Sequence, residues 1–585
     1  MILQALVDYY EELAERGQIA RPGWGDVKVS FALELDANGG LTHVIPLSSP
    51  SADGKKMVPQ TMELPAPVVR TVGIVSNFMW DNCSYLLGFD GKGKPERAKK
   101  CFAAARELHL SLLSDVDDSF AHAVCGFFDC WNPDRAAADP ALADCLDDVQ
   151  KGANLVFHFE GKFPDEDDAL CRAWQTHYDG RENGKTMRCL VTGEEAVPEE
   201  VHPSIKNVVG AQTSGAALVS FNAPAFWSYG EEYNFNAPVG RYAAFAYTTA
   251  LNTLLADKDH VRRFGDTTVV FWAENAEPAY QTAFAGFLDG GGDKLTNDEL
   301  QSCMDALSKG ECPNFEGIEL HPENRFYILG LAPNAARLSV RFFLRDSFGA
   351  FTKNVQRHYE DIRVVTDNRS KWDAIPLWAL LRETVNTNSK NKDALPQMAG
   401  DTLRSILSGQ AYPATLYQQT QLRIRAEREL TRGRAGIVKA YLIRLQNNEK
   451  YREALTVKLN EQTNYQPYIL GRLFSVLEGL QQAANPDINT TIKDKYFISA
   501  GATPAIVFPT LLNLAEKHLR KLDGRKHVYW AKQITELTGR ITETYPMHHG
   551  LYEQGVFQLG YYHQTQKRFE KKDKTDVAET IKEEK

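Results

Sequence analysis

The hydrophobic pattern of this chain changes near residue 376, and this change limits the folds open to it. Before that point, runs rich in β-branched and aromatic residues, such as VKVSFALEL (27–35) and TTVVFW (267–272), are typical of strands. They are mixed with amphipathic helical stretches such as ERAKKCFAAARELHLSLL (96–113). After it, stretches such as 421–446 keep helical spacing and carry few strand signals. The pattern predicts an α+β fold, with a large mixed N-terminal lobe followed by an all-helical C-terminal region.

Four helices joined by short connections are predicted after about residue 465, as a four-helix-type bundle. The first carries one apolar stripe, formed by Leu470, Leu473, Phe474, Leu477 and Leu480. Thr503 is predicted to cap the second helix, with Pro504 in its first turn and Gly524 at its end. We therefore divide the chain into a mixed α/β lobe, a basic helical connecting region, a helical bundle and a charged tail, at 1–375, 376–455, 456–570 and 571–585.

The charge of the chain is unevenly spread. The formal net charge is −10, but residues 1–400 carry 38 basic and 56 acidic side chains, whereas residues 401–585 carry 28 and 20. The two parts therefore differ in sign, at −18 and +8. Such a distribution permits a basic face turned toward a polyanion, and equally a basic half that docks on an acidic protein.

The nine cysteines are odd in number and contain no CxxC pair, which argues against a disulfide framework. Cys171, His177, Cys189 and His202 could form a zinc site, but their spacing is loose and buried thiols are favoured. We predict no metal and no cofactor. The chain has no run of 18 apolar residues and its first residues lack the pattern of a signal peptide. A cytoplasmic protein without membrane contact is expected.

Motifs of common enzymes are missing from the sequence. It has no P-loop, GxSxG elbow, HExxH or dinucleotide-binding fingerprint. The stretch LDGGGDKLTNDEL (288–300) fails as a calcium loop, because Lys294 and Leu300 stand where glycine and glutamate are required. We predict no catalytic residue and no enzyme. A metal-dependent nuclease built on carboxylates that meet only in space stays open as an alternative, as does a purely structural scaffold.

Several segments concentrate groups that suit nucleic-acid contact. In 70–100, side-chain amides stand beside a basic glycine-rich loop; the residues are Asn77, Asn82, Lys92 and Lys94. Amides can read base edges while lysines hold phosphates. By residue pattern alone, a core role for Trp80 and Tyr85 and a solvated turn at DGKGKP are favoured.

Two further segments have the same character. Gln212, Thr213 and Ser214 lie between Gly210 and Gly215, which permits close backbone approach to a ligand. The stretch 421–445 holds seven cations against two carboxylates; they are Arg423, Arg425, Arg428, Arg432, Arg434, Lys439 and Arg444. Phosphate contact is predicted there.

The stretch LVSFNAPAFWSYGEEYNFNAP (218–238) combines five aromatic side chains between its two Asn-Ala-Pro triplets with several amides and no regular period. We predict a packed loop whose aromatic rings wedge into the core. An unpaired buried amide costs ~1–3 kcal/mol, so most of Asn222, Asn234 and Asn236 are expected to have partners. On this interpretation the stretch is mainly scaffold, and only part of it touches nucleic acid.

Long and unusual strings carry a family resemblance over nearly the whole chain. They include MILQALVDYY, NFMWDNCSYLLG, CLVTGE, HPSIKNVVGAQTSGAALVSFNAPAFWSYG, NAPVGRYAAFAYTTALNTLL, FYILGLAPNAARLSVRFF and QGVFQLGYYHQ. With these strings, the chain resembles the large subunit of the type I-C CRISPR surveillance complex, Cascade (the Cas-eight-c, or Csd-one, family). The C-terminal bundle resembles the Cascade small subunit. No methionine lies between Met398 and Met547, so a separately made bundle would need a non-AUG start.

The resemblance implies a DNA-binding and RNA-binding subunit of an antiviral defence complex. Such a subunit recognises the protospacer-adjacent motif (PAM) on duplex DNA, aids strand separation and recruits the helicase-nuclease, while guide pairing reads the target sequence. The implied partners are the crRNA with its 5′ handle, target DNA and its displaced strand, the backbone and crRNA-processing subunits, small subunits and the helicase-nuclease. Asn77, Asn82, Lys92 and Lys94 become candidates for motif contact, and Gln212 with its neighbours for a wedge or groove loop.

Overall fold

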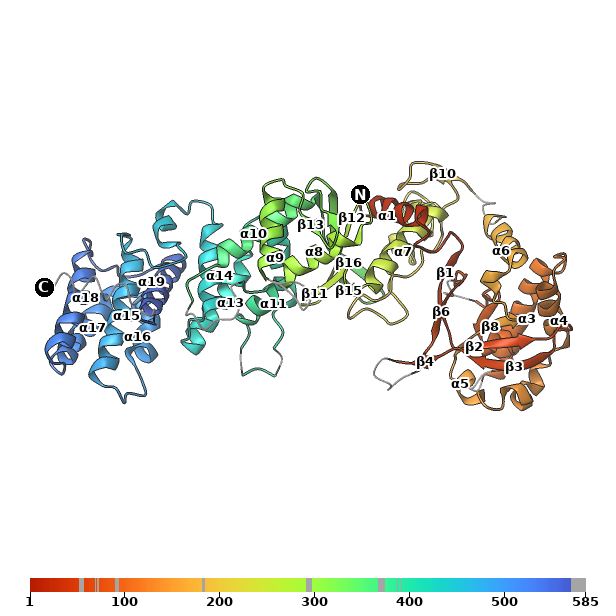
Figure 1. Ribbon diagram of the computed structural model, residues 1–585, viewed down its shortest axis with the longest axis horizontal. Helices are drawn as coiled ribbons and strands as arrows, with labels where there is room; N and C mark the ends of the chain where they lie inside the picture. The colour runs from red at the N-terminus through yellow and green to blue at the C-terminus, as the bar shows by residue number, and fades with distance from the viewer. Residues whose placement is uncertain are drawn as a thin grey trace. The chain divides into compact units, whose positions relative to one another are not determined.

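In the computed structural model (Figure 1), the chain divides into two units. The structure describes residues 1–51, 57–68, 70, 73–89, 94–180, 185–290, 297–366, 374–386, 388–390 and 392–569. The first unit comprises Met1–Asn207, Ala211–Ala256 and Asn334–Leu338, and the second comprises Val208–Gly210, Asp257–Pro333 and Ser339–Lys585. The α+β class is confirmed. The predicted boundaries near 376 and 456 both lie inside the second unit, and the tail 571–585 lies outside the described residues.

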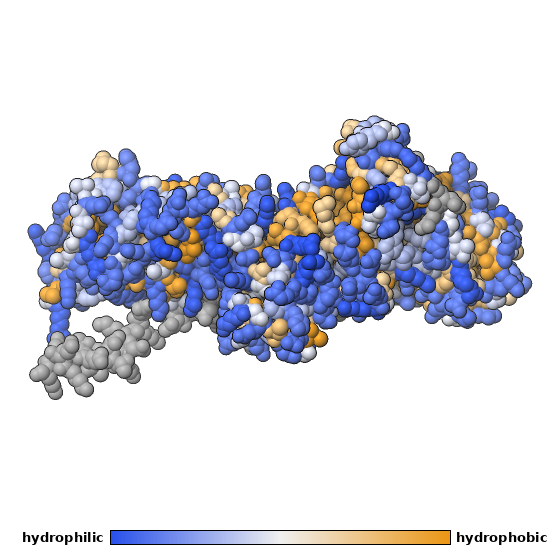
Figure 2. Space-filling model, turned by 90° about the horizontal axis from the view of Figure 1, so that it is seen from above, coloured by the Kyte–Doolittle hydropathy of each residue, from blue (hydrophilic) through white to orange (hydrophobic). Residues whose placement is uncertain are grey.

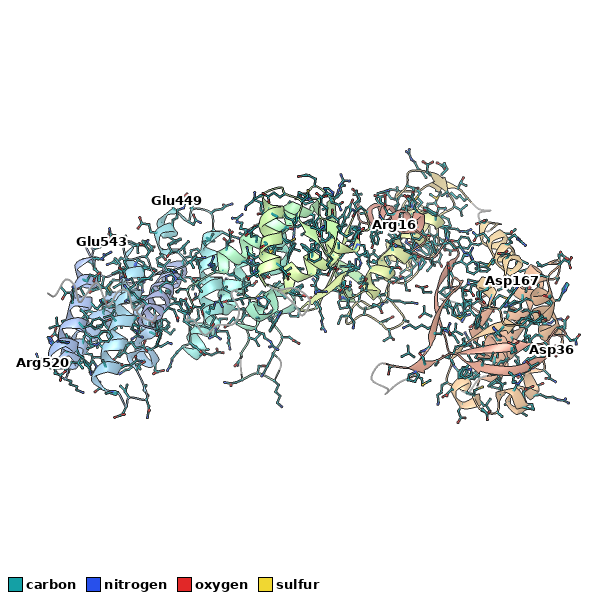
Figure 3. All side chains as sticks on the ribbon, in the orientation of Figure 1. Arg16, Asp36, Asp167, Glu449, Arg520 and Glu543 are labelled. Carbon is teal, nitrogen blue, oxygen red and sulfur yellow. The ribbon has the colours of Figure 1, made fainter. Side chains whose placement is uncertain are left out.

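A four-stranded sheet organises part of the first unit. Its order is β3 (Leu41–Pro46), β2 (Phe31–Leu35), β8 (Asn154–Phe159) and β7 (Trp80–Asn82). Strands β2 and β8 run parallel, and the outer pairs run antiparallel. The β2–β3 turn is fixed by Asp36 (labelled in Figure 3), whose carboxylate accepts hydrogen bonds from the backbone N–H groups of Asn38 and Gly40, both at 2.8 Å. The predicted strand 27–35 is two strands, because it is interrupted at Ser30.

Helices cover this sheet and share one apolar core with it. They are α3 (Pro95–Leu113), α4 (Ser119–Cys130) and α6 (Asp168–Gly180), with α2 (Cys83–Leu86) and α5 (Leu146–Gln150). Phe127, Phe128 and Phe157 pack edge to face within it, with ring centroids 5.2 to 5.7 Å apart. The predicted helix 96–113 is confirmed as α3.

The rest of the first unit is built from ribbons and a helix pair. Strands pair as β1 (Trp24–Val29) with β6 (Gln60–Pro65), β4 (Ser49–Pro50) with β5 (Met57–Val58), and β9 (Met187–Arg188) with β10 (Glu195–Ala196). Helix α1 (Ile2–Glu15) packs on α7 (Arg241–Ala256). The ring of Tyr10 meets the rings of Tyr242 and Phe245 edge to face.

The second unit contains most of another four-stranded sheet, whose hairpin tip Asn334–Leu338 belongs to the first unit. Its order is β11 (Val261–Phe264), β12 (Thr267–Ala273), β15 (Arg325–Asn334) and β16 (Arg337–Ser347). Every residue of β12 is buried, as expected of a central strand. Helices α8 (Pro278–Asp289), α9 (Asn297–Ser308) and α10 (Phe348–Ile362) pack in the same core, and β13 (Asn314–Phe315) forms a short hairpin with β14 (Ile318–Glu319).

From α11 onward, the described residues form helices and no strand. These helices are α11 (Leu377–Arg382), α12 (Pro396–Leu407), α13 (Ala414–Glu427), α14 (Arg432–Ile443), α15 (Gln466–Ala484), α16 (Ile492–Ala502), α17 (Pro504–Leu519), α18 (Gly524–Gly539) and α19 (Leu551–Phe569). The four predicted bundle helices are α15, α17, α18 and α19, and a fifth, α16, lies between the first two along the chain. One continuous apolar core joins the sheet of this unit to the bundle.

Thr503 behaves differently from the prediction. Pro504 begins α17 as expected, but the hydroxyl of Thr503 donates to the carbonyl of Ser499 at 3.1 Å and caps no N–H of α17. The reason is that Thr503 directly follows α16 as its C-cap, so its hydroxyl bonds to the last turn of that preceding helix. Gly524 does not end α17 either; it begins α18.

The face of the chain drawn in Figure 2 is mostly polar. Hydrophilic residues cover most of the face drawn in Figure 2, and hydrophobic ones lie in small groups among them. None of the described helices combines the length and the apolar character that a bilayer crossing requires.

Candidate nucleic-acid interface

A large cavity of about 1280 Å³ lies within the first unit. Its walls come from the loop after α1, from β1 and the segment following β6, from the loops between 200 and 222, from α7 and from Ala336 and Arg337. The walls combine side-chain amides and hydroxyls with three cations and three carboxylates. The cations are Arg70, Lys206 and Arg337, and the carboxylates are Asp26, Glu63 and Glu200.

Two of the predicted contact residues, Gln212 and Ser214, are exposed and line this cavity. They belong to a tight turn in which the N–H of Gly215 donates to the carbonyl of Gln212 at 2.9 Å. Gly215 has a φ of 102°, and a Cβ there would collide with the side chain of Ser204. Glycine is therefore required for the turn to approach the neighbouring segment. Thr213 is exposed at the same turn.

Helix α7 holds the segment that faces this turn. The side-chain carbonyl of Asn252 accepts the N–H of Lys206 at 2.7 Å, and its amide donates to the carbonyl of Ser204 at 3.1 Å. Ile205 then exchanges two backbone hydrogen bonds with Ala216, each 2.9 Å long. These hydrogen bonds thus hold the exposed Lys206 next to the turn that carries Gln212.

The segment 218–238 forms the adjacent rim, and its aromatic rings do not wedge into the core as predicted. It contains only short 3₁₀ turns, η4 (Pro224–Phe226) and η5 (Tyr233–Asn236), as an irregular loop should. Phe226 is 42 % exposed and Tyr229 is 92 % exposed. The two Asn-Ala-Pro stretches and the left-handed backbone at Tyr229 (φ 61°) keep the chain irregular. The other three rings of the segment, those of Trp227, Tyr233 and Phe235, are half-buried.

The amides of this segment have partners, as predicted. Arg337 donates to the side-chain carbonyl of Asn222 at 2.7 Å, and its guanidinium lies 4.0 Å from the ring centre of Phe226. The amide of Asn234 donates to the carbonyls of Glu199 and Glu200, and that of Asn236 donates to the carbonyl of Tyr233. These bonds fix the rim.

Two buried polar atoms in the cavity wall have no hydrogen-bond partner among the described residues. They are Nε2 of His202 and Oδ1 of Asn234, in residues that are 4 % and 1 % exposed. Nδ1 of His202 lies 2.7 Å from the hydroxyl of Tyr247, and burial lowers the His202 pKa to about 4, so the ring is neutral near pH 7. A neutral imidazole and an amide oxygen suit hydrogen bonding to an uncharged polar group.

The predicted contact segment 70–100 has a mainly structural role. Asn77 is 4 % exposed, and its side-chain carbonyl accepts the N–H of Val68 at 3.0 Å. The side chain of Asn82 caps α2 by accepting the N–H of Ser84 at 3.0 Å. Both acceptors are therefore used inside the protein, and the burial of Asn77 keeps it from contacting bases. Base contact by the half-buried Asn82 stays a prediction. Lys94 is exposed at the start of α3, and Lys92 lies outside the described residues.

The rings of this segment belong to the core, as the residue pattern favoured. Trp80 and Tyr85 are each 5 % exposed. Arg70, which lines the cavity, stacks over Tyr85 at 4.0 Å and forms a two-pronged ion pair with the buried Asp81. Burial raises the pKa of Asp81, while Arg70 and backbone N–H groups oppose that rise.

The arginine-rich stretch divides into inward and outward cations. Arg434, Lys439 and Arg444 are buried and bonded within the protein, which corrects the prediction that Arg434 contacts phosphate. Arg423 pairs with Glu427 at 3.7 Å, and Arg432 is half-buried. Only Arg425 and Arg428 of the predicted set are exposed.

Arg425 and Arg428 line a second cavity, of about 350 Å³, in the second unit. Its other wall is α16 with the following Thr503, and the polar residues of α16 in this wall are Lys493, Asp494, Lys495 and Ser499. Arg428 follows α13 in the left-handed conformation, with a φ of 56°, so its side chain leaves the line of the helix. The prediction missed this partner wall because α16 has no single apolar stripe; the capping box at Thr491 and Asp494 was its available signal.

The two cysteines of the possible zinc site make other contacts. The Cys189 thiol accepts backbone N–H groups of Val191, Thr192 and Gly240 at 3.2 to 3.5 Å. Burial alone raises its pKa, but these hydrogen bonds outweigh burial and lower it. Cys171 lies close to the carbonyls of Pro164 and Asp165. Among the described residues these side chains form no metal-binding group.

Comparison with protein families places this geometry in context. Residues 6–569 match the family described as CRISPR-associated protein (Cas_Csd1). The chain belongs to this family. Cas_Csd1 membership covers both units, including the turn of Gln212, the aromatic rim and the basic cavity of α13 and α16. A search of curated proteins gave no match.

Proposed function

We propose that this Cas_Csd1 protein is the large subunit of a type I-C Cascade complex, which recognises the PAM on duplex DNA, aids strand separation and R-loop formation, and recruits the helicase-nuclease. The observation that carries the proposal is the cavity rim of the first unit. There the exposed turn of Gln212 and Ser214 stands beside Lys206 and Arg337. Family membership supports a CRISPR role, and the rim supplies chemistry that suits DNA recognition.

The rim offers separate groups for base edges and for the backbone. The Gln212 amide and the Ser214 hydroxyl donate and accept hydrogen bonds, which suits base edges in a groove. Lys206 and Arg337 suit phosphates. Each base contact of this kind contributes ~1–3 kcal/mol, whereas each phosphate contact acts on all sequences and adds to the salt dependence.

The aromatic rim suits a separated strand. Phe226 and Tyr229 expose their rings, and base stacking on an aromatic ring contributes ~1–3 kcal/mol without sequence preference. In the neighbouring cavity wall, Nε2 of His202 and Oδ1 of Asn234 have no hydrogen-bond partner among the described residues. Together they support capture of an unstacked nucleotide next to the recognised motif.

The basic cavity of the second unit is proposed to hold phosphates of the displaced strand. The four cations Arg425, Arg428, Lys493 and Lys495 outnumber the single carboxylate of Asp494. Arg425→Ala is expected to reduce the slope of log affinity against log salt by about 1.

We also propose that the chain is not itself a nuclease. Incubation of the pure protein with DNA and Mg²⁺ or Mn²⁺ tests this, and metal-dependent cleavage would favour the nuclease alternative.

The central experiment measures binding of the assembled crRNA complex to duplex DNA, with and without this chain, at fixed salt. The targets differ only in the bases that flank the protospacer. Binding is expected to require the chain and to change strongly with those bases. Gln212→Ala is expected to lose about 10- to 100-fold on the preferred flank and little on the others.

Lys206→Ala, in contrast, is expected to weaken binding to all flanks alike. Gln60→Ala is the matched control for Gln212→Ala, because Gln60 is exposed in the same unit but does not line the cavity. If removal of the chain leaves binding and its flank dependence unchanged, the recognition role is wrong and the scaffold interpretation replaces it.

A further inference from the structure

A short hairpin in the second unit brings three metal-ligating side chains together outside both cavities. They are Cys312, Glu319 and His321, and one ligand atom from each lies within 4.8 Å of the others. We propose that this hairpin binds a divalent ion of the zinc type. The proposal does not depend on the DNA-recognition role.

The register of the hairpin explains why the three side chains meet. Asn314 pairs with Glu319 and Phe315 with Ile318, and the N–H of Leu320 donates to the carbonyl of Pro313 at 2.9 Å. Continued by one residue, this register sets Cys312 opposite His321. Side chains alternate between faces along a strand, so Cys312, Glu319 and His321 share one face.

The other face of the hairpin is anchored in the core. Phe315 and Leu320 are 6 % and 0 % exposed and belong to the main apolar cluster of the unit. The connecting residues Glu316 and Gly317 have φ values of 52° and 88°, as a tight two-residue hairpin turn requires. Because the opposite face is buried, the face with Cys312, Glu319 and His321 points to solvent, and all three side chains are exposed.

The backbone around the ligands is fixed on both strands. The N–H of His321 donates to the hydroxyl of Tyr280, a residue that is 1 % exposed, at 2.9 Å. The side chain of Asn314 accepts the N–H of Gly317 at 3.1 Å and so closes the turn. An ion would bind to a prepared site and would not have to order a loop.

The distances suit a tetrahedral ion. Sγ of Cys312 lies 3.4 Å from Nδ1 of His321. Ligand bonds of about 2.3 Å to sulfur and about 2.0 Å to nitrogen, at a tetrahedral angle, place these two atoms about 3.5 Å apart. A thiolate, an imidazole and a carboxylate form a donor set suited to Zn²⁺ or Co²⁺ and unsuited to Mg²⁺ or Ca²⁺. Three protein ligands leave one position for water.

Co²⁺ titration of the full chain tests the site. The protein is stripped of metal, kept reduced and titrated while the near-ultraviolet thiolate-to-Co²⁺ absorption is followed. The band is expected to saturate at one ion per chain and to be lost when Zn²⁺ is added. Cys312→Ser is expected to abolish it. Glu319→Gln and His321→Ala are expected to weaken Co²⁺ binding at least ~10-fold, since even groups outside the ligand shell are worth that much.

Cys130→Ser is the control, because Cys130 is the other exposed cysteine. It is expected to leave the band and the affinity unchanged. All the substituted side chains are exposed, so circular dichroism should match the unsubstituted protein in every variant. Absence of a saturable band in the unsubstituted protein, or a band that persists in Cys312→Ser, overturns the proposal.

Discussion

At the scale of single residues, Arg434 shows how an apparent ligand-binding cation can be a core residue. Its guanidinium pairs with Glu427 and Glu383 and donates to the carbonyls of Glu383 and Glu429, at 3.2 and 3.0 Å, while only 2 % of the residue is exposed. Arg434→Met is expected to lower the free energy of unfolding by about 3–5 kcal/mol, because it leaves carboxylates without their partner. Denaturant unfolding measures this.

Arg425 provides the comparison within the same stretch. It is exposed and donates to the side chain of Gln554 at 3.0 Å. Arg425→Ala is expected to change the free energy of unfolding by no more than about 0.5 kcal/mol. Equal losses in the two variants would contradict this division into buried and exposed cations.

His109 makes stability depend on pH in the acidic range. It is fully buried in α3; its Nδ1 lies 2.7 Å from the carbonyl of Ala105, and its Nε2 accepts the N–H of Met79 at 2.8 Å. Burial lowers its pKa to about 4. The unfolded chain, with a histidine pKa of about 6.5, takes up the proton first, so stability falls as pH drops from about 6.5 to about 4, by up to about 3 kcal/mol.

His109→Gln checks this source of pH dependence, because glutamine can still accept and donate but does not titrate in that range. The free energy of unfolding, followed from pH 7 to pH 4, is expected to fall less steeply in the variant. The buried His202 and His358, whose pKa values are also lowered by burial, keep part of the slope. An unchanged slope would show that His109 is not a source.

The sequence predicted which chemical groups are present better than it predicted which side chains are buried and which are exposed. The turn of Gln212 and the cations Arg425 and Arg428 were identified because amides, glycines and arginines are visible in a sequence. The burial of Arg434 and the exposure of Tyr229 were not, because they depend on which neighbouring segments pack against each face. Cys312, Glu319 and His321 come together only because of the strand pairing in the hairpin. Their spacing in the sequence does not show the close pairs that are typical of metal ligands.

At the scale of elements, two glycines set the contact between α15 and α19. A Cβ added to Gly560 would overlap the carbonyl oxygen of Tyr468, and one added to Gly471 would overlap that of Phe557. The helix backbones therefore touch. Gly560→Ala is expected to lower the free energy of unfolding by about 1–3 kcal/mol through overpacking, although alanine is the better helix former.

Gly539 in α18 is the matched control for this substitution. A Cβ there meets no atom within 4 Å. Gly539→Ala is expected to be neutral or to stabilise by up to about 1 kcal/mol. Thermal unfolding of the two variants compares them directly, and a harmless Gly560→Ala would contradict the close crossing. The apolar stripe predicted α15 from sequence, but the stripe says nothing of which partner approaches so closely.

At the scale of the whole molecule, the change of pattern near 376 marks a change of secondary structure within one core. Lys439 donates to the carbonyls of Glu360 and Asp361 at 3.0 and 2.8 Å, and Arg444 donates to the Asp361 carboxylate at 2.6 Å. Both cations are buried. A chain that begins at 376 would retain these cations and lose the Asp361 carboxylate and both carbonyls that Lys439 contacts.

We therefore expect different behaviour from two fragments. Residues 257–569 should fold, with one cooperative unfolding transition, because they contain the core that joins the sheet to the bundle. Residues 376–569 should be less stable by at least about 3 kcal/mol, since the loss of Asp361 leaves a buried charge unpaired. Denaturant unfolding of both fragments measures the difference. Equal midpoints would mean that the helical region is a separate domain, and that the pattern change in the sequence is also a boundary in the fold.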